Sequence, residues 1–141
     1  MRIVIVGGTS GIGMCLTRHL ALTNSVYIGS RDDSKVSTLI DSINRDSSYH
    51  NILNGSTLDA SNFSSVENFL HEANESMGGI DAIINCAGSL LLKPPHLIKE
   101  DEMKRVFEVN AFSCIALLKY GFKYMKQNGG SFVFFSSAAS K

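Results

Sequence analysis

A run of β-branched residues leads directly into a glycine-rich turn at the start of the chain. Residues 3–6 read IVIV, and residues 7–13 read GGTSGIG. Four consecutive apolar β-branched residues are typical of a strand that is buried on both faces of a parallel sheet. Glycines allow the backbone to turn sharply after such a strand, and the apolar spacing that follows predicts a helix. The chain therefore starts with a predicted strand–turn–helix unit, the building block of an α/β fold.

The same alternation of strand and helix continues to residue 135. The expected strands cover residues 3–6, 26–28, 52–58, 80–86 and 132–135. The expected helices are one over 11–22, one after the capping residues Asp32, Asp33 and Ser34, one from Asn62 to Gly78, and a single long one over 100–126. Right-handed crossovers turn this order into a doubly wound, Rossmann-like parallel sheet with strand order 3-2-1-4-5. At 141 residues, we expect one domain over 1–141.

Composition argues against several classes of partner. Thirteen basic and thirteen acidic residues cancel, so no net charge favours nucleic acid or an acidic membrane surface. No apolar run approaches the length of about 20 residues that spans a bilayer. The start of the chain leaves no room for a signal peptide before residue 3. We expect a cytoplasmic protein that acts on small molecules, with neither nucleic acid nor membrane as a partner.

The cysteines and histidines indicate neither a disulfide framework nor a metal site. Cys15, Cys86 and Cys114 are odd in number, far apart and within apolar segments, which favours reduced thiols in the core. The four histidines show no metal-binding spacing with the cysteines or with one another. We therefore expect no metal ligands.

The glycine turn suits the binding of a dinucleotide. Backbone amides at a helix N-terminus hold a pyrophosphate, and side chains at the turn would block its approach. A turn that merely leads into a helix also needs glycines. The position between the first strand and the first helix favours a dinucleotide cofactor.

Several motifs, in order, resemble those of the short-chain dehydrogenase/reductase family. The turn resembles the family's T-G-x-x-x-G-x-G, with Val6 in place of the threonine. Further matches are Asp59 after the third strand, Asn85-Cys86-Ala87-Gly88 for the family's N-N-A-G, Asn110 in the long helix and Ser137 after the fifth strand. The resemblance covers the whole chain but only the first half to two-thirds of a typical member, so it implies a fold without the family's C-terminal strands.

The residue after the second strand bears on which cofactor is bound. An NAD-binding fold usually has a carboxylate there for the adenosine ribose, whereas this chain has Ser30 followed by Arg31. A hydroxyl and a guanidinium suit a 2′-phosphate, so we expect NADP rather than NAD, although the carboxylates Asp32 and Asp33 come directly after Arg31.

The resemblance implies that Asp59 reaches the adenine. The alternative role for Asp59 is an N-terminal cap of the next helix. The expected cofactor-binding residues are Gly7, Thr9, Ser10, Gly11, Ile12, Gly13, Ser30, Arg31, Asp59, Ala60, Asn85, Ala87 and Gly88.

Catalysis in the family moves a hydride between a nicotinamide and a carbonyl or alcohol. The resemblance implies that Ser137 binds the substrate oxygen and that Asn110 orders a water of the proton relay; Asn110 could instead be a polar residue in the helix interior that bonds a backbone carbonyl. The family's Tyr-x-x-x-Lys pair does not occur in these 141 residues. We therefore expect that the chain alone is inactive and binds the cofactor weakly or not at all.

Two interpretations of the missing pair remain open. The chain is either an N-terminal segment of a longer reductase, which we favour, or a self-standing dinucleotide-binding sensor or interaction module. In the first case strand 132–135 would be an edge that awaits a neighbour. The long helix carries more apolar residues than one face needs, namely Ile115, Leu118, Tyr120, Phe122 and Met125, so we also expect a homo-oligomer, a dimer or tetramer, when full length.

Overall fold

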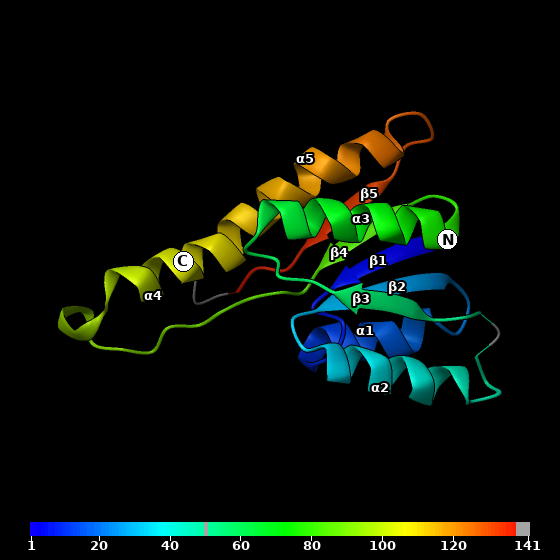
Figure 1. The fold of residues 1–141 in the computed structure, drawn as a ribbon, viewed down its shortest axis with the longest axis horizontal. Helices are drawn as coiled ribbons and strands as arrows, with labels where there is room; N and C mark the ends of the chain where they lie inside the picture. The colour runs from blue at the N-terminus through cyan, green and yellow to red at the C-terminus, as the bar shows by residue number, and fades with distance from the viewer. Residues whose placement is uncertain (50, 138–141) are drawn as a thin grey trace.

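The computed structural model describes residues 1–49 and 51–137. Its centre is a parallel sheet of five strands in the order β3-β2-β1-β4-β5, as the sequence predicts (Figure 1). The strands are β1 (Arg2–Val6), β2 (Ser25–Ser30), β3 (Asn54–Thr57), β4 (Ala82–Asn85) and β5 (Ser131–Phe134). All four pairings are parallel, so every strand ends at the same edge of the sheet.

Helices cover both faces of this sheet, two on each. The helices α1 (Gly11–Leu20) and α2 (Asp33–Asn44) pack on one face, and α3 (Phe63–Met77) and α5 (Ser113–Met125) on the other (Figure 1). The N-caps agree with the sequence, because the side chains of Asp32 and Asn62 accept the amides of Lys35 and Ser65. No helix among the described residues is long and apolar enough to cross a membrane.

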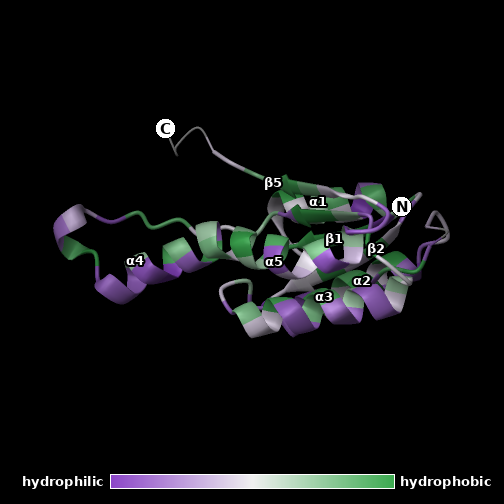
Figure 2. Cartoon of the chain, turned by 90° about the horizontal axis from the view of Figure 1, so that it is seen from above, coloured by the Kyte–Doolittle hydropathy of each residue, from purple (hydrophilic) through white to green (hydrophobic). Residues whose placement is uncertain are grey.

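The two-residue period of β1 divides the core into two clusters. Val4 and Val6 point to the α3 and α5 side, where Phe69 and Leu117 are buried. Ile3 and Ile5 point to the α1 and α2 side. Because the four side chains that follow Arg2 in β1 are buried, this stretch can be apolar without alternation. Figure 2 shows the apolar strands between the helices.

The long helix predicted over 100–126 is not continuous. It consists of α4 (Glu100–Phe107), a π-helical turn η2 (Glu108–Phe112) and α5. Apolar periodicity did not reveal the break, because a π-turn adds about one residue without any breaker residue. A short 3-10 helix, η1 (Pro95–Leu97), precedes α4, and α4 projects away from the body of the domain (Figure 1).

Smaller differences from the sequence prediction concern the ends of helices and strands and the burial of individual side chains. The first helix ends at Leu20 rather than residue 22, and the third and fourth strands are shorter than predicted. Cys15 is exposed, and Cys86 and Cys114 are only partly buried, so the expectation of three core thiols is wrong. On α5, Met125 belongs to the core, whereas Ile115 and Phe122 are 55% and 59% exposed.

The strand β5 forms one edge of the sheet described here. Phe132 packs against the core, while Val133 and Phe135 are 42% and 49% exposed. The sequence prediction of an apolar edge strand at residues 132–135 is therefore confirmed for the described residues.

An ion pair joins the amino ends of β1 and β4, opposite the edge where the strands end. The guanidinium of Arg2 donates through Nε and Nη2 to the carboxylate of Asp81, with the Nη2–Oδ1 distance at 2.5 Å. The backbone amide of Arg2 donates to Oδ2 of Asp81 at 2.8 Å. The hydrogen bond from Arg2, its amide and its charge lower the pKa of Asp81 to about 2. The charged carboxylate is thus favoured in the folded state.

Asp81→Asn should lower the free energy of unfolding at pH 7 by about 1 kcal/mol, because the pair is partly exposed and solvent screens it. The folded pKa lies below the unfolded value of about 3.9, so this contribution is complete above pH 4 and lost as the pH falls toward 2. Urea unfolding between pH 7 and pH 2 measures it. The control Asp41→Asn removes the exposed pair with Arg45 and should change stability by less than about 0.5 kcal/mol; equal losses in the two variants would contradict the prediction.

Candidate functional site

The glycine turn brings the start of α1 against the end of β1. Gly7 has a φ of +77°, a conformation that residues with a Cβ rarely adopt. The amides of Gly7 and Gly8 donate to the carbonyl of Gly29 at 2.8 and 3.2 Å. A Cβ on Gly13 would lie 2.1 Å from the carbonyl oxygen of Gly7. No side chain fits between the two backbone segments, so glycine is required at position 13.

The first turn of α1 faces the edge where the strands end. Ser10 is its N-cap residue, with extended backbone, and among the described residues its side chain makes no capping hydrogen bond. The amides of the first turn therefore keep the partial positive charge that attracts an anion. This arrangement suits a pyrophosphate, as the sequence predicts.

Thr17 is a supporting residue that the sequence did not reveal. Its side chain is fully buried, and Oγ1 lies 2.9 Å from the carbonyl oxygen of Gly13 and 3.1 Å from that of Gly8. One hydroxyl proton thus serves two carbonyls at either side of the turn. A signal was present in hindsight, because Thr17 lies one helical turn after the last glycine of the motif.

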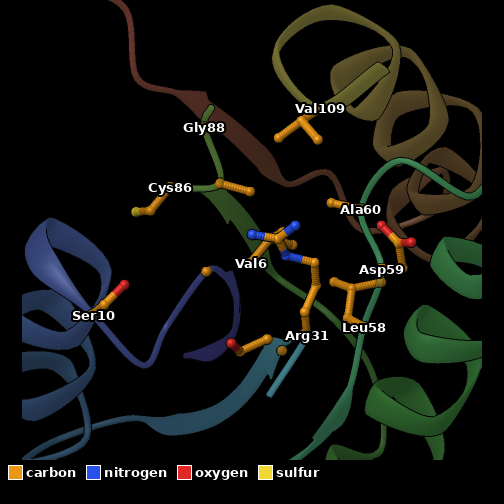
Figure 3. Close-up of a pocket in the computed structure, with 13 residues that line it drawn as sticks. Val6, Ser10, Arg31, Leu58, Asp59, Ala60, Cys86, Gly88 and Val109 are labelled. Atoms are coloured by element: carbon orange, nitrogen blue, oxygen red, sulfur yellow. The ribbon is translucent and has the colours of Figure 1, made fainter. Parts of the chain in front are cut away.

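A cavity of about 140 Å³ lies beside the turn, where β1, β2, β3 and β4 end (Figure 3). It is lined by many of the predicted cofactor-binding residues: Gly7, Ser10, Ser30, Arg31, Asp59, Ala60, Ala87 and Gly88. Other lining residues are Val6, Gly29, Leu58, Cys86 and Val109. Residues that are distant in the sequence therefore form one concave surface, which is the usual place for a ligand in a doubly wound sheet.

The end of β2 carries the polar groups expected for a 2′-phosphate. The hydroxyl of Thr9 donates to that of Ser30 at 2.8 Å. Thr9, Ser10, Ser30 and Arg31 also line a second hollow next to the first cavity, together with Asp32, Asp33, Ser34 and Lys35. In Figure 3 the Arg31 side chain extends into the cavity from the end of β2. One guanidinium therefore faces both hollows.

Asp59 lies on the opposite wall, at the end of β3. Its Oδ1 accepts the hydroxyl of Ser61 at 2.6 Å and the Ser61 amide at 3.1 Å. The hydroxyl of Ser61 is the largest cause that lowers the pKa of Asp59, and the charges of Arg105 and Arg31 add to it. Asn62, not Asp59, caps α3, so the capping role is wrong.

Two asparagines connect the end of β4 and the loop after it to the start of α5 and to the π-turn. Buried Asn85 accepts the amide of Ala87 at 3.1 Å and donates to the hydroxyl of Ser113 at 3.1 Å. Oδ1 of Asn110 accepts a hydrogen bond from the amide of Ser89 at 2.7 Å, and Nδ2 of Asn110 donates one to the carbonyl oxygen of Ser89 at 2.8 Å. Asn110 thus bonds a backbone carbonyl, as the alternative role predicts, and this carbonyl belongs to a neighbouring loop. Burial raises the pKa of the Cys86 thiol, which keeps it protonated.

Some predicted residues are not among those that line the cavity. Gly11 and Gly13 shape the turn, Ile12 is exposed on α1, and Asn85 lies behind the wall. Asn110 follows the lining residue Val109, and Ser137 follows β5 with an exposed side chain. Over residues 1–49 and 51–137, no three His, Cys, Asp or Glu side chains gather in a way that could hold a metal ion.

Comparison with known families identifies this architecture. The family model described as "short chain dehydrogenase" matches residues 1–141. The chain belongs to the short-chain dehydrogenase family. This family comprises oxidoreductases.

Known members of the family match this chain over part of their own length. The 3-dehydrosphinganine reductase of Danio rerio is 28% identical over 146 residues, which cover 99% of this chain and 43% of that protein. A structure of the NADH-dependent reductase A1-R′ complexed with NAD superimposes with a TM-score of 0.86 at 22% identity, covering 99% of this chain and 60% of that one. Actinorhodin polyketide ketoreductase with NADPH gives a TM-score of 0.87 at 20% identity, covering 96% and 53%. The chain thus spans about half the length of these relatives, and folds of this kind hold either nicotinamide cofactor.

Thr17→Val should loosen the glycine turn. Valine has the shape of threonine but no hydroxyl, so the carbonyls of Gly8 and Gly13 lose their shared donor inside the protein. We expect the free energy of unfolding to fall by about 1–2 kcal/mol, measured by urea denaturation.

The control is Thr38→Val, which makes the same change on the exposed side of α2 and should shift stability by less than about 0.5 kcal/mol. The interpretation of Thr17 fails if its variant is as stable as the control.

Proposed function

We propose that residues 1–141 are the dinucleotide-binding domain of a cytoplasmic, NADP-preferring short-chain oxidoreductase that interconverts a small-molecule carbonyl and its alcohol. The observation that supports this most is the cavity at the strand ends, where the glycine turn, Arg31 and Asp59 meet. A pyrophosphate, a 2′-phosphate and an adenine each have a chemically matched partner on one surface.

The glycine turn suits the pyrophosphate of the cofactor for two reasons. The Gly7 carbonyl fills the space of a Cβ on residue 13, and the amides of the first turn of α1 face the edge where the strands end. The first turn of α1 would hold the pyrophosphate. Ser30 and Arg31 would bind the 2′-phosphate through charge-assisted hydrogen bonds, whereas a carboxylate at position 30 would repel this phosphate. Asp59 would accept a hydrogen bond from the adenine amine, with Leu58 and Ala60 as its apolar surroundings.

For the reaction, the nicotinamide supplies the hydride or accepts it. The roles of the chain's own residues are the binding of the substrate oxygen by the Ser137 hydroxyl and the ordering of a relay water beside Asn110. The full proton relay needs a Tyr-x-x-x-Lys pair, which these residues do not contain. The exposed apolar side chains of α5, Ile115 and Phe122 among them, support a homo-oligomer in the intact enzyme.

Arg31→Ala should abolish the preference for NADP. Loss of charge-assisted bonds to the 2′-phosphate should weaken NADP(H) binding about 10- to 100-fold, while NAD(H) binding stays within about twofold. Titration calorimetry with both cofactors on the 141-residue chain measures the ratio of affinities.

The matched control for Arg31 is Arg45→Ala, which removes an exposed arginine at the other end of α2 and should change neither affinity. If the Arg31 variant binds both cofactors as the unaltered chain does, the 2′-phosphate site is refuted. Micromolar NADP(H) binding by the 141-residue chain would favour the sensor or interaction module.

The 141-residue chain should not reduce carbonyl compounds in the steady state. Without the tyrosine and lysine, no group of suitable pKa protonates the product oxygen. Following NADPH absorbance with a panel of ketones and aldehydes tests this. Sustained turnover by this chain alone would show that the assignment of the proton relay is wrong.

A further inference from the structure

The hydroxyl of Ser113 is a buried polar group with two partners. The Ser113 side chain is 0% exposed. Its Oγ donates to the carbonyl of Val109 at 2.6 Å and accepts Nδ2 of Asn85 at 3.1 Å. Because a buried hydroxyl costs free energy unless its hydrogen bonds are made, this pairing depends on the close approach of α5 to the end of β4.

The bond to Val109 compensates for the π-turn. In an α-helix the Ser113 amide would donate to the carbonyl of Val109, four residues earlier. Here that amide is directed to the carbonyls of Ala111 and Glu108. The hydroxyl of Ser113 takes the place that its own amide has left. One side chain therefore satisfies a carbonyl of the π-turn from inside the domain.

The same hydroxyl links the π-turn to the wall of the cavity. Asn85 ends β4, and the next three residues, 86–88, line the cavity. A second link runs from Asn110 to the backbone of Ser89. The two links start three residues apart, at Asn110 in the π-turn and at Ser113, the first residue of α5, and they reach the strand end and the loop that follows it. Asn110 is exposed, so its own surroundings hold it less firmly than those of Ser113 do.

We propose that Ser113 is a positioning residue that holds Asn110 and Val109 in register with the end of β4. The role in catalysis rests on the proposed function, because Asn110 is a catalytic residue only if the domain belongs to an active oxidoreductase. The positioning role does not rest on the proposed function, since it concerns only hydrogen bonds among the described residues. Without the Ser113 hydroxyl, the π-turn is free to relax and the Asn110–Ser89 pair becomes weaker.

Amide hydrogen exchange of Ser89 tests the proposal in the 141-residue chain. This amide donates to Oδ1 of Asn110, so its protection reports where Asn110 lies. Ser113→Ala should accelerate its exchange about 3- to 10-fold, with amides of β1 and β2 changed less than twofold. Unchanged exchange at Ser89 would overturn the proposal, and so would a uniform acceleration of all amides, which marks a purely global loss of stability.

Thr17→Val is the matched control for this measurement. It also removes a fully buried helix hydroxyl that bonds the carbonyl four residues earlier, but it lies at the glycine turn on the other face. In the Thr17→Val variant, the exchange rate of the Ser89 amide relative to that of the β1 amides should not change. If it accelerates Ser89 as much as Ser113→Ala does, the effect is not specific to the π-turn and the proposal fails.

A double-mutant cycle separates positioning from an independent effect. Asn110→Ala removes the acceptor of the Ser89 amide, so adding Ser113→Ala should cause no further acceleration if Ser113 acts through Asn110. A second, additive acceleration would contradict the proposal. If Ser113→Ala does not fold, Ser113→Cys is the second variant, because its thiol is a weak donor of similar size. The Ser89 amide should exchange faster in Ser113→Cys than in the unaltered chain. An unchanged rate would contradict the positioning role of Ser113.

NADPH titration of the same variants distinguishes this proposal from the proposed function. Weak or absent NADPH binding is expected of this chain alone, whereas measurable and equal affinities of the unaltered chain and an Arg31→Ala variant would count against the proposed function. The exchange of Ser89 would still decide the role of Ser113, since that measurement needs no cofactor.

Discussion

The close approach of two backbone segments, Gly7 and Gly13, is the constraint on which the site depends. Because the Gly7 carbonyl occupies the space where a Cβ of residue 13 would lie, α1 begins directly against the end of β1. That position aims the amides of its first turn at the cavity. It also places Thr17 under the turn, where one hydroxyl serves two carbonyls. A larger residue at position 13 would move the helix as a whole, and with it one wall of the site.

The amino ends and the carboxyl ends of the strands have different roles. At the amino ends, the ion pair of Arg2 and Asp81 and the start of the buried strands contribute to stability. At the carboxyl ends, glycines, asparagines and short polar side chains replace large apolar ones, so the chain leaves a hollow there instead of a packed core. Stability and ligand binding are thus largely separated along one direction, which lets residues of the site vary without removing the core.

The fold was predictable from the sequence because its signals are local. The strand at residues 3–6, the glycine turn and the caps Asp32 and Asn62 each specify their own element, and right-handed crossovers then order the strands. The walls of the cavity followed from the same topology. Only the spacing of Thr17 from Gly13 pointed to its role; otherwise a helix serine or threonine, such as Ser113, looks the same in sequence whether it faces solvent or a buried carbonyl. The exposure of Cys15 was missed for a similar reason: an apolar neighbourhood in sequence does not say which face of a helix points inward.

The π-turn between α4 and α5 also changes the phase of the two helices. Since successive residues of an α-helix are turned by about 100° around its axis, one additional residue rotates everything before it by about that angle relative to everything after it. The side of α4 that would have continued the buried side of α5 is therefore turned away from it. Removing one residue from 108–112 would turn the α4 face, together with the loop before it, to a different side of the domain. The length of a single helical turn thus sets the direction in which a whole segment of this protein faces its surroundings.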